Sequence, residues 1–199
     1  PPRQNSIGLI MYNTAVELSR EIDVSLILKR SSQAPTTQGF PFRLEMIDTP
    51  WDDLLTQVVG RYPRWAGRLG LGEVADQYWN YARNVSGTLQ RASCDVSHVM
   101  NYWQWCRTLR DESCPLVLEM QSEWLSQMDS DRVARQLQMA DAVVGVSEHI
   151  TSLFRQSFPE YRGLVATAYN GVDVETFRPV EGGAEATEAQ GDERRVLFV

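Results

Sequence analysis

The segment 140–179 constrains the fold more than any other part of this 199-residue chain. A short apolar run at 142–146 and another at 164–169 enclose an amphipathic stretch whose apolar residues recur at helical spacing. Ser147 can cap the start of that helix, and Pro159 ends it. A strand, a crossover helix and a second strand form one parallel unit, which is right-handed in nearly all proteins. The sequence therefore predicts an α/β fold with a parallel sheet.

The second apolar run is followed by Asn170-Gly171, and both residue types tolerate positive backbone φ angles, so we expect a turn there. The order A-D-A-V-V-G-V-S-E, a helix, then Y-N-G-V-D-V-E-T-F-R-P resembles the end of the N-terminal domain in retaining GT-B glycosyltransferases of family 4. The resemblance implies a Rossmann-like parallel sheet with helices on both faces. It also implies transfer of a sugar from a nucleoside diphosphate sugar to an acceptor hydroxyl, with retained anomeric configuration.

The resemblance further implies how the chain is divided. Residues 1–179 would be the N-terminal, acceptor-side domain of such an enzyme, without its first strand. Residues 180–193 are rich in Gly, Ala and acids and read as a linker. Residues 194–199 begin an apolar strand, which we expect to open a C-terminal, donor-binding domain. The chain starts with Pro1-Pro2, so we expect it to be truncated at both ends and inactive by itself.

Composition narrows the classes of partner. The net charge of −7 argues against nucleic acid, because phosphate binding needs a clustered basic surface. No apolar run approaches the ~20 residues of a membrane span, and no leader peptide is recognisable. Cys94, Cys106 and Cys114 lack CxxC spacing, so neither a zinc site nor a disulfide framework is indicated. We therefore expect a cytoplasmic protein.

A basic and aromatic segment lies at 61–72, between two stretches with helical periodicity. There, Trp65 with Arg61, Arg64 and Arg68 combines apolar and basic side chains. Such a segment can cover an acceptor or touch a membrane surface, although most clusters of this kind are packing with solvated charge. Peripheral contact with the inner face of a membrane is therefore one expectation. We predict that the segment itself is an irregular connection.

Periodicity predicts the remaining elements. We expect a helix over 7–22, strands at 24–28, 42–47, 95–100 and 115–120, two helical segments within 51–91, and a helix carrying Val133, Ala134 and Leu137.

The start of the first helix is a predicted anion site. Asn5, Ser6 and Gly8 form its polar entry, and the first acidic residue of the helix is Glu17. The partial positive charge of the amino end is therefore uncompensated and can bind a diphosphate or a carboxylate. A capped, solvated helix start is the alternative interpretation. In the resembling family, a glycine-containing loop at this place faces the cleft between the two domains.

A polar and aromatic cluster follows the predicted strand 95–100. His98, Asn101 and Tyr102 lie at its carboxyl end, and ligands of open α/β sheets bind just outside that edge. His98 is therefore a candidate catalytic residue, and Asn101 and Tyr102 are candidate substrate-binding residues. The alternative for His98 is a core histidine with satisfied hydrogen bonds.

The loop after the next strand carries two further candidate catalytic residues, Gln121 and Glu123. Members of the resembling family often have a histidine in this loop, whereas this chain has Glu119 and Gln121, and glutamine cannot titrate. Glu123 is then the best local group for stabilising charge, or it serves as a helix cap. By the same resemblance, Ser147, Asn170 and Gly171 are candidate substrate-binding residues.

No metal is expected. The triplet Asp129-Ser130-Asp131 looks like the DxD metal motif of other glycosyltransferases, but it directly precedes a helix, where carboxylates act as caps. GT-B enzymes generally need no metal, so the resemblance implies no cofactor. A nucleoside diphosphate sugar would be the co-substrate, and a glycan, a lipid or a small molecule would be the acceptor.

Two alternatives stay open from sequence. One is a binding or interaction module without catalysis on the same scaffold, which the loop without histidine favours. The other is a different two-domain GT-B enzyme, such as a sugar epimerase or a phosphorylase.

Overall fold

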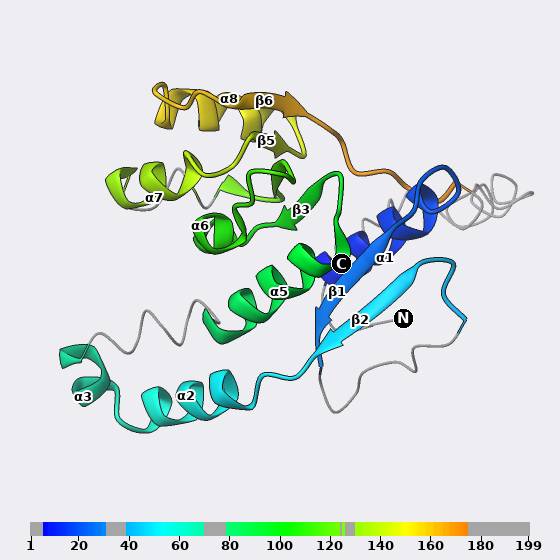
Figure 1. The fold of residues 1–199 in the computed structure, drawn as a ribbon. Coiled ribbons are helices and arrows are strands. Elements are labelled where there is room, and N and C mark those ends of the chain that lie inside the picture. The colour runs from blue at the N-terminus through cyan, green and yellow to red at the C-terminus, as the bar shows by residue number, and fades with distance from the viewer. Residues whose placement is uncertain (1–5, 31–38, 70–78, 124, 126–129, 175–199) are drawn as a thin grey trace, which may run out of the picture. The chain divides into compact units, whose positions relative to one another are not determined.

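The computed structural model describes residues 6–30, 39–69, 79–123, 125 and 130–174 of the chain. Internal contacts divide the chain into two units, residues 1–169 and 170–199. Only 170–174 of the second unit are described, and the sheets and helices below all belong to the first unit (Figure 1). The predicted linker at 180–193 and the predicted strand at 194–199 lie outside the described residues.

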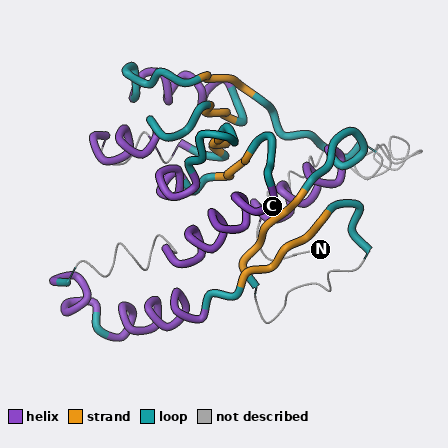
Figure 2. The backbone as a smooth tube through the Cα atoms, viewed as in Figure 1, coloured by secondary structure: helices purple, strands orange, loops and turns teal. Residues whose placement is uncertain are grey.

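Strands and helices follow one another along the first unit (Figure 2). In chain order they are α1 (Ser6–Leu18), β1 (Ser25–Lys29), β2 (Arg43–Ile47), α2 (Pro50–Arg61), α3 (Pro63–Arg68), α5 (Trp79–Ala92), β3 (Ser97–Met100), the 3₁₀ turn η1 (Trp103–Trp105), α6 (Cys106–Leu109), β4 (Leu116–Met120), α7 (Ser130–Leu137), β5 (Ala142–Gly145), α8 (Glu148–Ser157) and β6 (Leu164–Thr167).

Every pair of neighbouring strands in the described residues is parallel. Four strands form one sheet in the order β3-β4-β5-β6, with Val99 opposite Leu118, Leu118 opposite Val143, and Val143 opposite Val165. A second sheet contains β1 and β2. The predicted α/β class with a parallel, Rossmann-like arrangement is confirmed.

The core of the four-stranded sheet lies on one of its faces. Its strands are consecutive and all advance in the same direction, so right-handed crossovers place α6, α7 and α8 together on one side. On that side, alternate residues of β4 are fully buried: Leu116, Leu118 and Met120. They pack in one cluster with Val133 and Leu137 of α7 and with Phe154 of α8.

Helix α5 is held by contacts from distant parts of the chain. The buried carboxylate of Asp52, in α2, accepts hydrogen bonds from the backbone N–H of Asn80 at 3.1 Å and of Tyr81 at 2.7 Å. The Tyr81 hydroxyl donates to the carbonyl of Ile27 in β1 at 3.2 Å. Tyr81 also packs into the core of the four-stranded sheet. Through α5, the two-stranded sheet is therefore tied to the larger one.

Three sequence predictions were wrong in detail. The first helix ends at Leu18 rather than at Ile22, which follows a turn and is 58% exposed. The connection predicted to be irregular contains a short helix, α3, because Pro63 favours the first turn of a helix. A turn was expected at Asn170-Gly171, but these two residues form none, and in the described residues positive φ angles occur only at Gly39, Ser93 and Asn101.

Candidate functional site

The carboxyl ends of β3 to β6 meet at one edge of the four-stranded sheet, because these strands are parallel and in register. The loops that leave this edge begin at Asn101, Gln121 and Val146. In open α/β sheets such an edge is where ligands bind. The predicted site residues that follow β3, β4 and β5 are therefore on one edge, as expected.

The imidazole of His98 lies beside the carboxylate of Glu119, on the sheet face opposite α6, α7 and α8. Side chains alternate along a strand, so the burial of Val99 and Leu118 on the helix side turns His98 and Glu119 to the other side. The His98 Nε2 atom lies 2.9 Å from Glu119 Oε2, and their side chains are 40% and 13% exposed. The pair is thus reachable from solvent while its carboxylate is mostly enclosed.

Gln121 extends this pair into a row of three polar side chains. Its Nε2 donates a short hydrogen bond to Glu119 Oε1, so both carboxylate oxygens of Glu119 have a partner. The row His98, Glu119, Gln121 joins two predicted catalytic residues through a glutamate that the sequence did not mark as a site residue. The missed signal was the alternation within β4, which places Glu119 on the same face as His98.

Asn101 fixes the geometry at the end of the row. Its φ is 64°, in the left-handed region that Asn tolerates better than most residues. Its N–H donates to the carbonyl of Glu119 and its Oδ1 accepts from the N–H of Gln121, both at 2.8 Å. Because Asn101 is buried and its Oδ1 is engaged, it holds the two loops in register rather than facing solvent.

Tyr102 is placed by an aromatic stack. Its ring lies parallel to that of Trp105, with centroids 4.1 Å apart and planes 6° apart, and Trp105 in turn meets Tyr81 edge to face. The ring of Trp103 is buried in the core. Trp103 is therefore a packing residue, whereas Tyr102 belongs to a half-buried aromatic stack.

Ser147 caps α8. Its Oγ accepts a hydrogen bond from the N–H of Ile150 at 3.3 Å, and its backbone is extended. The strand before it ends in Gly145, where a Cβ atom would lie 2.5 Å from Oγ1 of Thr151. A glycine is therefore required for α8 to approach β5, and the serine hydroxyl is used in the cap.

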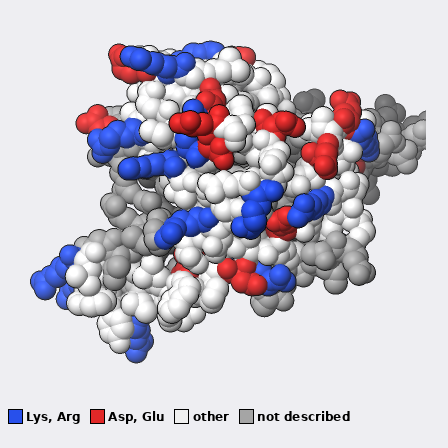
Figure 3. All heavy atoms as spheres, in the orientation of Figure 1, with Lys and Arg blue, Asp and Glu red and all other residues white. Residues whose placement is uncertain are grey.

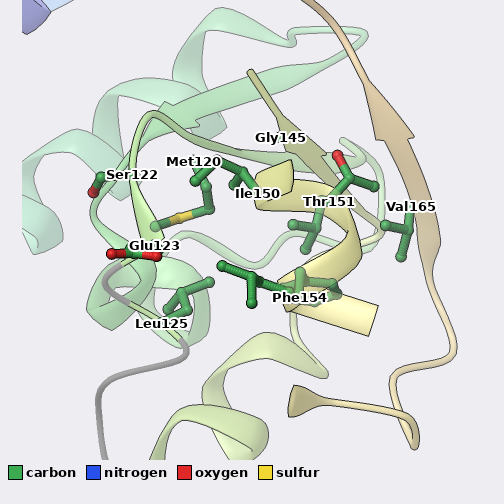
Figure 4. A pocket seen from close by; sticks show the side chains of 11 residues that line it. Met120, Ser122, Glu123, Leu125, Gly145, Ile150, Thr151, Phe154 and Val165 are labelled. Carbon is green, nitrogen blue, oxygen red and sulfur yellow. The ribbon is translucent and has the colours of Figure 1, made fainter. Parts of the chain in front are cut away.

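Glu123 pairs with the first turn of α8. Its Oε2 lies 3.7 Å from Nε2 of His149, and both side chains are substantially exposed, so the interaction is weak. Glu123 also lines a small cavity, beside Ser122 (Figure 4).

This cavity is a packing space. Its volume is about 10 Å³, close to that of one water, and apolar side chains from β4, β5 and α8 line most of it. Figure 4 shows Met120, Leu125, Ile150 and Phe154 around it. A sugar would have to bind above the edge, on the exposed side of the His98 row, and not inside this cavity.

The remaining predicted site residues are not brought to this edge by any described contact. Asn5 and the side chain of Ser6 lie outside the described residues, and Gly8 is half-buried in the first turns of α1. The first turn of α1 has no acidic residue, as predicted. Asn170 and Gly171 belong to the second unit.

The metal motif considered from sequence is only partly described. Asp129 lies outside the described residues, while Asp131 is in the first turn of α7, where an acid stabilises the helix dipole. In the described part of the chain, no group of three or more His, Cys, Asp or Glu residues is arranged to hold a metal ion. Among the described helices, none combines the length and apolar character of a membrane-spanning helix.

Comparison with known proteins gives no family: no protein-family model matches the chain, and no curated protein matches it significantly. The fold and the geometry of the edge therefore carry the functional argument.

Proposed function

We propose that this chain is the acceptor-side domain of a retaining GT-B glycosyltransferase. The observation that carries the proposal is the row His98, Glu119, Gln121, which runs along one face of a parallel sheet from the second residue of β3 to the residue that follows β4. A sugar presents neighbouring hydroxyls that each donate and accept hydrogen bonds. A carboxylate flanked by an imidazole and an amide supplies matching acceptors and donors in one line.

In this proposal, the side chains of the row have different roles. Glu119 holds His98 and Gln121 in place, since its carboxylate lies 2.9 Å from Nε2 of His98 and accepts a hydrogen bond from Nε2 of Gln121. His98 is the most exposed of the three residues in the row, and in this proposal it binds and orients the acceptor hydroxyl. Its imidazole can also accept the proton that the hydroxyl loses on reaction. The contribution to rate is chiefly orientation and electrostatic preorganisation.

The donor in this proposal is a nucleoside diphosphate sugar, and a second domain supplies most of its contacts. The amino end of α1, without an acid in its first turn, supports a diphosphate contact from this chain. No metal and no cofactor are part of the proposal. The 199-residue chain by itself is expected to bind saccharides weakly and to transfer none.

The direct test uses a protein that contains this chain and its donor-binding domain. It would be incubated with isotopically labelled nucleoside diphosphate sugars and candidate acceptors, and the anomeric configuration of the product read by NMR. We expect a glycoside of retained configuration, and loss of most turnover in His98→Ala. Arg162→Gln, at an exposed position before the amino end of β6, is the matched control and keeps full turnover.

A different product would contradict the proposal. An inverted glycoside, an epimerised sugar nucleotide or a sugar phosphate would each assign another reaction. Measurable transfer by the 199-residue chain alone would also contradict it.

A second candidate is a carbohydrate-binding module without catalysis, which Gln121 favours because it hydrogen-bonds but cannot titrate. Saccharide binding at the same row, combined with absence of turnover in the two-domain protein, would select this alternative.

A further inference from the structure

Helices α2 and α3 expose a stripe of large apolar side chains. In α2, Trp51, Leu54 and Val58 recur at spacings of three and four, which places them on one helix face. Three more large apolar residues follow: Tyr62 between α2 and α3, Trp65 in α3, and Leu69 directly after α3. Five of these residues are between 49% and 70% exposed: Trp51, Leu54, Tyr62, Trp65 and Leu69.

This stripe is not the packing face of α2. The side that faces the protein is marked by Asp52, which is buried and bonded to the amino end of α5. Single exposed hydrophobic residues are common on protein surfaces and need no explanation, but a row that includes two tryptophans on consecutive helices is a candidate interaction surface. We call it the α2–α3 surface, defined by Trp51, Leu54, Val58, Tyr62, Trp65 and Leu69.

The charge beside this surface is basic. Arg61, Arg64 and Arg68 are exposed, and each directly precedes a position occupied by Tyr62, Trp65 or Leu69. Between residues 50 and 69 the only acidic residues are Asp52, which is buried, and Asp53, which pairs with Lys29. Figure 3 shows basic side chains gathered beside uncharged atoms at α3.

We propose that the α2–α3 surface docks the protein on an anionic lipid bilayer. Tryptophan and tyrosine combine an apolar ring with a polar group and favour the level of the lipid headgroups. Arginine can lie along the apolar layer while its guanidinium reaches lipid phosphates. The partner must also carry negative charge, because Arg61, Arg64 and Arg68 are exposed beside the apolar side chains, while the two acids of this segment are either buried, at Asp52, or paired, at Asp53.

Vesicle co-sedimentation tests the proposal with the full 199-residue chain. The probes are vesicles of phosphatidylcholine alone and vesicles of phosphatidylcholine mixed with phosphatidylglycerol. We expect binding to the mixed vesicles that weakens as salt is added. Replacing Arg61, Arg64 and Arg68 with Gln is expected to lower the partition coefficient by about fivefold for each arginine.

Variants that remove single tryptophans test the contribution of the apolar side chains of the α2–α3 surface. Trp51→Ser and Trp65→Ser are each expected to lower partitioning by about tenfold. The matched controls are a triple variant of exposed arginines elsewhere, Arg20→Gln, Arg43→Gln and Arg162→Gln, and the exposed apolar variant Leu164→Ser. The controls should bind vesicles as the unchanged chain does, and circular dichroism would verify that each variant is folded.

Three results would overturn the proposal. The first is no sedimentation with anionic vesicles, and the second is equal loss of binding in the control variants. The third is a concentration-dependent dimer in analytical ultracentrifugation that Trp65→Ser dissolves, which would assign the surface to a second copy of the chain. The docking surface does not depend on the sugar site, so either proposal can fail without the other.

Discussion

The carboxylate of Asp52 lies 2.7 Å from the backbone nitrogen of Tyr81, 29 residues further along the chain. It also accepts from Asn80, so one buried side chain of α2 satisfies two N–H groups in the first turn of α5. Free N–H groups at a helix start are usually satisfied by a residue just before the helix. Here the cap comes from another helix, and it fixes α2 against α5.

Removing this carboxylate should be strongly destabilising. Asp52→Ala is expected to lower the free energy of unfolding by about 3 kcal/mol, because two N–H groups at a buried helix start lose a charged acceptor. Urea denaturation followed by circular dichroism would measure it. Asp53→Ala is the control: its carboxylate is more than half exposed and pairs with Lys29, so the loss should stay below about 1 kcal/mol. Equal effects of the two variants would contradict the interhelical cap.

Gly145 is required by the close approach of α8. A Cβ atom there would lie 2.5 Å from Thr151 Oγ1 and 3.0 Å from its backbone nitrogen, so Gly145→Ala should cost about 2 kcal/mol of stability. Gly87→Ala is the opposite case, since its Cβ would meet only the end of the Arg91 side chain at 3.5 Å. In the interior of α5, that change should stabilise the protein by about 0.5–1 kcal/mol. Thermal unfolding of both variants would show opposite shifts of Tm.

Asp141 should make stability depend on acidic pH. Desolvation, the largest single influence, acts to raise the pKa of Asp141, but hydrogen bonds from the Leu116 N–H and the Arg110 guanidinium together outweigh it, so the pKa lies below its usual value. A group with a lowered folded pKa stabilises the protein above the unfolded pKa of about 3.9. That stabilisation is lost as the pH falls through the folded pKa.

The measurement is the free energy of unfolding of the unchanged chain and of Asp141→Asn from neutral pH down to acid. The variant should be less stable at neutral pH, and the difference should shrink only below about pH 4. Asp48→Asn, which removes an exposed carboxylate beside Arg30, controls for the loss of one surface charge. If the difference in unfolding free energy between the two proteins stayed constant as the pH fell into the acid range, the stabilising effect of Asp141 would not depend on its negative charge.

The cysteines should be poorly reactive in the folded protein. Burial, followed by a hydrogen bond with Cys114, raises the pKa of Cys94 to about 11, and burial raises the pKa of Cys106 to about 12. The thiolate is the reactive form, so labelling of Cys94 by a thiol reagent should quicken about tenfold for each pH unit between 7 and 10. Cys106 should react only after unfolding. Fast labelling of all three thiols at neutral pH would contradict these environments.

The order of the elements could be predicted because it depends on local pattern. The apolar runs that became β4, β5 and β6, and the helical spacing of Phe154 and Phe158, are properties of a few neighbouring residues. Parallel pairing then followed from strands alternating with helices. The buried faces of α7 and α8 were correct for the same reason, as Val133, Leu137 and Phe154 are in the core.

The rest depends on contacts between distant residues, which one sequence does not reveal. Asp52 reads as an ordinary acid in the first turn of α2, and only the folded chain brings it to Tyr81. Of the candidate site, His98 and Gln121 were predicted, but Glu119, which joins them, was not. The hydrogen bond from the Tyr81 hydroxyl to the carbonyl of Ile27, which connects α5 to the two-stranded sheet, could not be predicted either, because no local sequence pattern indicates it.

The central claim is that a saccharide binds at the carboxyl edge of the four-stranded sheet, over the row His98, Glu119, Gln121. The most direct test is a titration of the ¹⁵N-labelled chain with methyl glycosides and nucleoside diphosphate sugars, followed by two-dimensional NMR. The account predicts shifts at the amides of Asn101, Gln121 and Ser147, and about tenfold weaker binding in His98→Ala. No saccharide-dependent shift, or shifts confined to the opposite edge around Ser97 and Leu116, would contradict it.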